Sequence, residues 1–281
     1  MTQLKHIAIV SETTKVSFSD VALASAALQK QVLRDFTPIW NESATVDAFP
    51  KLEDVPLGSW AVIIRDDIGF PGAAGIHLDN EGQPFALVQF GTTWQLTTSH
   101  EILEMLADPF GNRLASGDSI KPGQGKVQYL VEVCDPSEDF QFGYRVNGIR
   151  LSDFYTTNFF DPMKKSNTQY SFTEAIKEPR QVLKGGYLSW FDPISNHWWQ
   201  ARFFGSKITF VDLGVITAAN GDFRSAIELQ TVVEEKINGL PAGDPRLKTV
   251  KAPLMAAMTA SSSKADSWHL QIDALKAQYA P

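Results

Sequence analysis

The feature that most constrains the fold is the segment Ser99-His100-Glu101-Ile102-Leu103-Glu104-Met105-Leu106-Ala107-Asp108-Pro109. Thr97 or Thr98 can cap a helix that runs through His100 to about Ala107. The helix has to stop at Asp108-Pro109, because proline lacks a backbone donor and its ring clashes with the preceding turn. The chain therefore has to accommodate a short, abruptly ended helix that carries one imidazole and two carboxylates.

The residues before this helix indicate a strand, a long helix and a small sheet. Ile7 to Val10 is typical of a short buried strand, and Ser19 to Phe36 of an amphipathic helix with a Ser-rich start. Three β-type runs separated by Pro and Gly turns follow, at Ala44 to Phe49, Trp60 to Arg65 and Phe85 to Phe90. The N-terminal half is therefore expected to mix α and β structure.

The residues after the helix indicate mostly strand and loop, and then a change of composition near residue 222. The β-type runs are Val127 to Cys134, Gly186 to Phe191 and Lys207 to Val211. Phe223 to Ile237 and Ala265 to Ala277 have helical spacing, and the intervening residues are rich in Gly, Pro, Ala and Ser. We expect an α+β main domain over 1–221 and a helical appendage with a flexible connector over 222–281.

Charge and composition exclude several classes of function. Twenty-five basic and 32 acidic residues give a net charge of −7, and the basic residues are scattered, so neither nucleic acid nor an anionic membrane surface is an expected partner. The single Cys134 excludes an internal disulfide and a Cys-rich zinc module, and is expected to be a small core residue. With no signal peptide or membrane span in the sequence, a cytoplasmic location is the default, although export without a signal would leave no trace.

The spacing within the central helix predicts a metal site. Residues four apart share a helix face, so His100 and Glu104 can bind one ion through a nitrogen and an oxygen. Glu101 is turned by about 100° around the axis, where it can reach a metal-bound water instead of the metal. Metal-assisted hydrolysis requires this arrangement, in which two side chains bind the metal and a neighbouring carboxylate accepts a proton from water.

Further carboxylates follow about thirty residues later. Glu132, Asp135 and Glu138 lie at the end of an apolar run, where several acids need a cation or solvent to be tolerated. Asp108 adds one more close to the helix. These acids favour the metal-site hypothesis over an ordinary polar helix surface.

With these motifs, the segment Ile7 to Asp161 resembles the zincin metallopeptidases, in a branch with His-Glu-x-x-Glu in place of His-Glu-x-x-His. The resemblance implies a zincin-like small mixed sheet, His100 and Glu104 as zinc ligands, and Glu101 as the general base. It also gives Phe85 to Phe90 the role of the sheet edge along which a peptide substrate lies extended. The pattern of the metzincin branch fails, because Ala107 and Phe110 stand where it needs Gly and a third ligand.

The third ligand is expected to be a downstream carboxylate, either Glu132 or Asp135. Glu132 is slightly favoured because its side chain alternates with Val131 and Val133, whereas Asp135 could cap the following turn. Either choice gives a site rich in oxygen. Besides zinc, Ca²⁺ or Mn²⁺ at this site, or a separate Ca²⁺ near Asp108, Asp135 and Glu138, therefore stays open.

Other polar and aromatic residues are weaker candidates for roles in the site. Tyr187 follows Gly185-Gly186, a pair that permits close backbone approach, and its hydroxyl could stabilise an oxyanion; Tyr155 is a second candidate for that role. His77 is expected to be an exposed turn residue, and His197 to lie in a loop before an aromatic strand. The aromatic cluster of Phe154, Tyr155, Phe159 and Phe160 is expected to be core or cleft wall.

Two functions are compatible with these residues. The first is a zinc-dependent hydrolase that cleaves a peptide or amide bond in a peptide or protein substrate. The second is a non-catalytic zincin-like protein that keeps its metal for stability within a larger assembly. Glu101 favours the enzyme, because a structural site has no use for a carboxylate beside its first ligand. The sequence indicates neither a substrate nor an oligomeric state.

Overall fold

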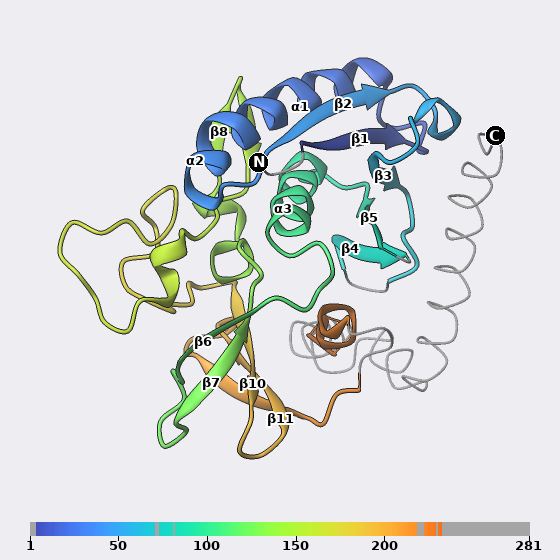
Figure 1. The fold of residues 1–281 in the computed structure, drawn as a ribbon. Coiled ribbons are helices and arrows are strands. Elements are labelled where there is room, and N and C mark those ends of the chain that lie inside the picture. The colour runs from blue at the N-terminus through green and yellow to red at the C-terminus, as the bar shows by residue number, and fades with distance from the viewer. Residues whose placement is uncertain (1–3, 71–72, 81, 218–221, 229, 232–281) are drawn as a thin grey trace.

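The computed structural model describes residues 4–70, 73–80, 82–217, 222–228 and 230–231. It is a mixed α+β structure with two five-stranded sheets and one two-stranded sheet (Figure 1). The helices are α1 (Phe18–Lys30), the π-helical η1 (Gln31–Phe36), α2 (Thr37–Trp40) and α3 (Trp94–Ala107), with short 3-10 turns η2 (Leu52–Asp54), η3 (Asp135–Ser137), η4 (Phe140–Phe142) and η5 (Thr157–Phe160). The strands are β1 (Lys5–Ser11), β2 (Ala44–Phe49), β3 (Trp60–Arg65), β4 (Gly75–Asn80), β5 (Gln83–Gln89), β6 (Leu114–Asp118), β7 (Lys126–Leu130), β8 (Tyr144–Val146), β9 (Ile149–Leu151), β10 (Tyr187–Asp192), β11 (His197–Arg202) and β12 (Thr209–Gly214).

The first sheet has the strand order β2-β1-β3-β5-β4, in which β4 alone is antiparallel to its neighbour. Alternate residues of β1 face opposite sides, as the two-residue period of a strand requires. Ile7 and Ile9 pack on the core that includes α1 and α3, whereas Ala8 and Val10 pack beneath the loops on the other face. Both helices therefore cover the same face of the sheet.

The edge of this sheet next to α3 is β4, and the expectation that Phe85 to Phe90 form the edge is wrong. Those residues fall mainly in β5, which is hydrogen-bonded to β3 on one side and β4 on the other. β4 and β5 pair in antiparallel fashion from Asn80 and Gln83 onward, whereas the sequence pattern indicates only a turn between two runs there. A peptide that adds to this edge would pair with β4.

Helix α3 begins six residues before His100, earlier than the sequence suggested. Its N-cap is Thr93, and Thr97 and Thr98 lie inside the helix. Trp94 and Leu96 are buried, so apolar packing extends the helix beyond the threonines, and the Thr98 hydroxyl donates to the Trp94 carbonyl. Almost the whole helix is buried, including His100, Glu101 and Glu104.

The second sheet is antiparallel throughout, in the order β12-β11-β10-β7-β6. The predicted strand Val127 to Cys134 is shorter than expected, because β7 ends at Leu130 and an irregular turn carries the chain to η3. The double glycine before β10 does permit close approach. A Cβ on Gly186 would lie 2.5 Å from the carbonyl oxygen of Asp135, so this glycine brings β10 against η3.

The last described residues, 222–228 and 230–231, pack against the second sheet, and the side chain of Arg224 reaches β4 and α3. Residues 223–228 and 230–231 are helical, and Phe223 packs on Trp198 of β11 (Figure 1, orange). The amides of Phe223 and Arg224 both donate to the carbonyl of Gly111. The proposed boundary at 221/222 stays a prediction, and the rest of the predicted appendage lies outside the described residues. Among the helices that the structure describes, none is long and apolar enough to cross a membrane.

Candidate metal centre

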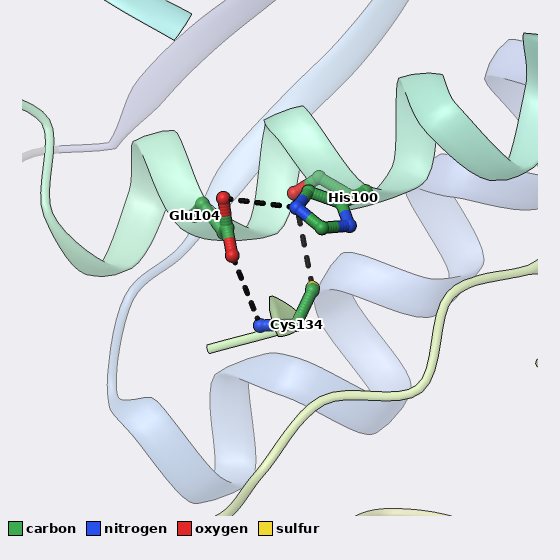
Figure 2. Close-up of side chains that lie close together, drawn as sticks. All are labelled: His100, Glu104 and Cys134. Atoms are coloured by element: carbon green, nitrogen blue, oxygen red, sulfur yellow. Dashed lines mark hydrogen bonds and ion pairs between the residues drawn. The ribbon is translucent and has the colours of Figure 1, made fainter. Parts of the chain in front are cut away.

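Helix α3 places His100 and Glu104 one turn apart on a single face. The Nε2 atom of His100 lies 3.1 Å from Oε2 of Glu104 (Figure 2). The other carboxylate oxygen of Glu104 accepts a hydrogen bond of 3.1 Å from the backbone amide of Cys134. Glu104 is therefore fixed between the helix and the turn that follows β7.

Asp135, in η3, is the acid that lies beside His100. Its Oδ1 atom is 3.3 Å from Nε2 of His100, is buried, and makes no hydrogen bond within the described structure. One imidazole nitrogen thus faces two carboxylate oxygens, although it can donate at most one proton. Ligands about 2.0 Å from a tetrahedral ion lie about 3.3 Å from one another, so each carboxylate has the spacing of a ligand relative to Nε2. Asp135 forms a ligand group with His100 and Glu138, and another with Glu104 and Glu132.

Glu132, the slightly favoured third ligand, is oriented differently. Its Oε2 accepts a 2.9 Å hydrogen bond from Nε of Arg224, and its Oε1 is buried without a hydrogen-bond partner. Glu132 lies in an acidic group with Glu104 and Asp135, but not in a group with His100. Strand alternation does not orient its side chain, because the strand ends two residues earlier. Of the two candidates, the geometry favours Asp135.

Burial and mutual repulsion dominate the electrostatics of this cluster. Burial raises the pKa of Asp135 to about 7, with the charge of Glu104 adding to the effect. Burial likewise raises the pKa of Glu132 well above its usual range and that of Glu228 to about 8, in both cases against the opposing charge of Arg224. The described cationic groups therefore do not suffice to keep all these carboxyls ionised, and Asp135, Glu132 and Glu228 favour their neutral forms.

Glu104 behaves in the opposite way. Burial favours its neutral form, but the charge and hydrogen bond of His100 and the charge of Arg224 hold its pKa well below the ordinary value. Burial also opposes a charge on His100, yet the neighbouring Glu104 raises the pKa of His100 well above its ordinary value. The two residues form an ion pair around which the other acids gather.

Glu101 lines a pocket of about 370 Å³ together with His100 and Tyr187. A Cβ on Gly75 would lie 2.4 Å from Oε1 of Glu101, so only glycine at this position of β4 leaves room for the carboxylate. Four carboxylates line the pocket, those of Glu101, Glu138, Asp139 and Glu228, and no Lys or Arg is among the described residues that line it. Glu101 and Tyr187 both line this cavity.

Two residues of the site were missed or misjudged. His77 is a buried residue of β4 rather than an exposed turn residue, since its side chain points at Glu101 and is 1% exposed. Arg224 extends its guanidinium among Glu101, Glu104 and Glu132 and is 5% exposed. No local pattern marks His77. Arg224 lies on the apolar face of the helix predicted at Phe223 to Ile237, and an arginine there indicates a buried acidic partner.

Other predicted residues lie apart from the cluster. Tyr155 is fully buried in the aromatic core, stacked on Phe159 at a ring distance of 4.2 Å. His197 begins β11 and lies 2.9 Å from Asp212. The carboxylate of Asp108 accepts hydrogen bonds from the backbone amides of Asn112 and Arg113. Among the described residues, Asp108 forms no possible metal-ligand group with Asp135 and Glu138. Cys134 is buried as expected, and it also lies within ligand distance of His100 and Glu104.

Comparison with protein-family models, with curated proteins and with solved structures finds no match to this chain. Function is therefore inferred from the site alone.

Proposed function

We propose that the protein is a metal-dependent hydrolase of peptide or amide bonds, with zinc held by His100, Glu104 and Asp135. The observation that carries the proposal is the placement of Nε2 of His100 at 3.1 Å from Glu104 and 3.3 Å from Asp135. The unpartnered Oδ1 of Asp135 supports a cation at this point, because a buried carboxylate oxygen without a donor is costly. The nitrogen and oxygen ligands suit zinc, and Mn²⁺ or Ca²⁺ are the alternatives for such an oxygen-rich set.

The surrounding residues have positions suited to hydrolysis. When bound, zinc would polarise a substrate carbonyl and lower the pKa of a water molecule. Glu101, at the pocket wall, would accept a proton from the attacking water and deliver it to the leaving amine. Tyr187, on the same wall, would donate a hydrogen bond to the developing oxyanion.

The sheet edge supports an extended peptide as the substrate. The pocket includes Ala73, Ala74 and Gly75, where the chain enters β4. Since β4 is the last strand of the described sheet, a peptide could pair with its first residues by strand addition and pass His100 and Glu101, up to the carbonyl of His77 that Arg224 occupies. We propose a zincin-like fold because a mixed sheet with an antiparallel edge strand lies beside a helix that carries the His-Glu-x-x-Glu motif.

One observation favours the second candidate, a non-catalytic metal-binding or interaction protein. Nη2 of Arg224 lies 3.2 Å from Oε2 of Glu101, the carboxylate assigned as general base. A guanidinium that is paired with this carboxylate competes with a water molecule for the same oxygen. The two candidates differ in whether Glu101 still accepts a proton.

Metal content and turnover, measured together, test the proposal. Purified wild-type protein loaded with Zn²⁺ is analysed by mass spectrometry of the elements and assayed on a library of quenched fluorescent peptides. We expect one zinc at the His100 site, with turnover; Glu101→Gln should keep that zinc but lose turnover by about 10²-fold or more, as loss of a general base does. His100→Ala and Asp135→Asn should lose this zinc, and the exposed Glu53→Gln serves as the matched control.

Two results would decide against the enzyme. If Glu101→Gln cleaves as fast as wild type, Glu101 is not the general base. If zinc binds at the His100 site but no peptide is cleaved, the non-catalytic candidate replaces the hydrolase.

A further inference from the structure

His77 makes the kind of contact that prepares a histidine to bind a metal. Its Nε2 atom lies 3.2 Å from the carbonyl oxygen of Asp108, an acceptor, so Nε2 carries the proton. Nδ1 is buried and has no hydrogen-bond partner in the described structure. Metal-ligating histidines are commonly oriented in this way, with one ring nitrogen donating to a carbonyl and the other facing the ion.

Nδ1 of His77 faces two carboxylates. It lies 3.6 Å from Oε2 of Glu101 and 4.0 Å from Oε2 of Glu104, and the three atoms form a group of ligand-like spacing. The exposed fractions of the three side chains are 1%, 4% and 0%. Two buried carboxylates that face one ring nitrogen are unfavourable unless a cation lies between them.

Arg224 supplies a cation at this point. Nη2 of Arg224 lies 3.2 Å from Oε2 of Glu101 and 3.3 Å from Oε2 of Glu104, the same two oxygens that face His77. Its Nη1 donates to the backbone carbonyl of His77, not to the imidazole. The guanidinium therefore satisfies the carboxylates but leaves the imidazole nitrogen unpartnered.

We propose that His77, Glu101 and Glu104 form a second divalent-cation site, at which the guanidinium of Arg224 takes the place of the ion. One imidazole nitrogen and two carboxylate oxygens suit Zn²⁺ or Mn²⁺. The protein thus holds a metal ion on the His100 side of Glu104 and an arginine on the His77 side. The inference shares Glu101 and Glu104 with the proposed function, but it stands or falls on His77 and Arg224.

The charges around Arg224 support a divalent occupant. Four carboxylates lie within 3.4 Å of the guanidinium, from Glu101, Glu104, Glu132 and Glu228. A single positive charge can pair fully with only one of these four carboxyl groups, and a buried charge is costly unless it is paired. A divalent ion would neutralise more of this charge and would also give His77 a partner.

Replacement of Arg224 by an uncharged side chain of similar length tests the inference. Wild type, Arg224→Met and Arg224→Met/His77→Ala are stripped with chelator, reloaded with excess Zn²⁺, desalted and analysed for bound zinc. We expect Arg224→Met to hold one equivalent more than wild type, and the added His77→Ala change to remove that equivalent. Arg224→Lys, which keeps the charge, should stay at the wild-type value. The matched control is Arg180→Met, since the Arg180 guanidinium contacts carbonyl oxygens of 160, 161 and 162.

Each outcome is decisive for the second site. An unchanged zinc content in Arg224→Met, or an extra ion that persists without His77, overturns the inference. If Arg224→Met is unfolded without metal, thermal melts with added Zn²⁺ decide, because the inference requires zinc to restore the fold. Asp135→Asn changes only the His100 site, because Asp135 is not a ligand of the second site. If wild type binds no zinc but Arg224→Met binds one His77-dependent ion, the proposed function fails and the second site stands.

Discussion

Glu104 separates two regions that are built from the same kinds of ligand but are completed by different cations. On one side, His100 and Asp135 lie beside it, and His100 also borders the large pocket. On the other side, His77 and Glu101 lie beside it, and Arg224 fills the space between the carboxylates. The difference teaches that ligand types alone do not identify a metal site, because a guanidinium from a remote segment can satisfy the same carboxylates.

The largest effect is expected from Glu104→Gln, because Glu104 belongs to both regions. The substitution removes the one negative charge that pairs with both His100 and Arg224. The low pKa of Glu104 shows that its charged form is favoured in the fold, so its loss should destabilise the protein. We expect a loss of about 3–5 kcal/mol in the free energy of unfolding, measured with urea, together with loss of bound zinc.

Glu132→Gln is the comparison for that prediction. The pKa of Glu132 is raised by burial, so its charge is unfavourable, and the amide oxygen of Gln can still accept from Arg224. The metal-free variant should be as stable as wild type or more stable. If Glu104→Gln and Glu132→Gln are destabilised equally, Glu104 is not the shared centre of the two regions.

A smaller effect is expected from Gly75→Ala, which separates the role of Glu101 from that of the metal ligands. The new Cβ would meet Oε1 of Glu101 and must displace the carboxylate. We expect turnover to fall about tenfold or more, with a loss of stability of about 1–3 kcal/mol, typical of overpacking, and with zinc retained. Gly91→Ala is the control, because a Cβ there meets nothing within 4 Å. Wild-type turnover in Gly75→Ala would mean that the position of Glu101 is not critical.

The smallest effect concerns pH. Without metal, folded Asp135 keeps its proton up to a pKa of about 7, whereas the unfolded carboxyl ionises near its ordinary value of 3.8. The folded state therefore binds more protons, and the stability of the metal-free protein falls as pH rises through this window. Zinc requires the ionised carboxylate and a neutral His100, so the stabilisation by saturating zinc should be larger at pH 8 than at pH 6, with Asp135 alone contributing about 1.4 kcal/mol.

Thermal melts with and without zinc at the two pH values check this expectation. Asp135→Asn should reduce the pH dependence, and the part that remains should come from the proton that zinc displaces from His100. A zinc effect that is equal at both pH values would mean that Asp135 does not lose a proton when the ion binds.

Much of the fold followed from the sequence, because short-range patterns determine its strands. Ala44 to Phe49 and Trp60 to Arg65 were predicted residue for residue, and β1 and β10 differ only at their ends. The predicted helix over Ser19 to Phe36 has a π-helical final part, where Gln31 bonds to Tyr144, Ser152 and Ser99. Such long-range contacts override local propensity and leave no periodic signal.

The candidate site was predictable where its residues share one helix. His100, Glu101 and Glu104 follow from spacing alone, whereas the choice between Glu132 and Asp135 depended on where β7 ends. His77 was misjudged because β4 was missed, and a histidine between two turns gives no sign of burial. Arg224 was missed because its partners are 92 to 147 residues away in the chain.

That separation also determines the order in which the molecule can assemble. The strands of the first sheet, helix α3 and strand β7 all precede residue 136. A growing chain can therefore form the first sheet and α3 long before Arg224 has been synthesised. Until then the buried acids lack their guanidinium, and the nascent domain should be less stable than the finished one. Free metal ions could bind these acids before Arg224 is synthesised. The supply of metal ions during synthesis, and not only afterwards, would then help to determine how much folded protein is obtained.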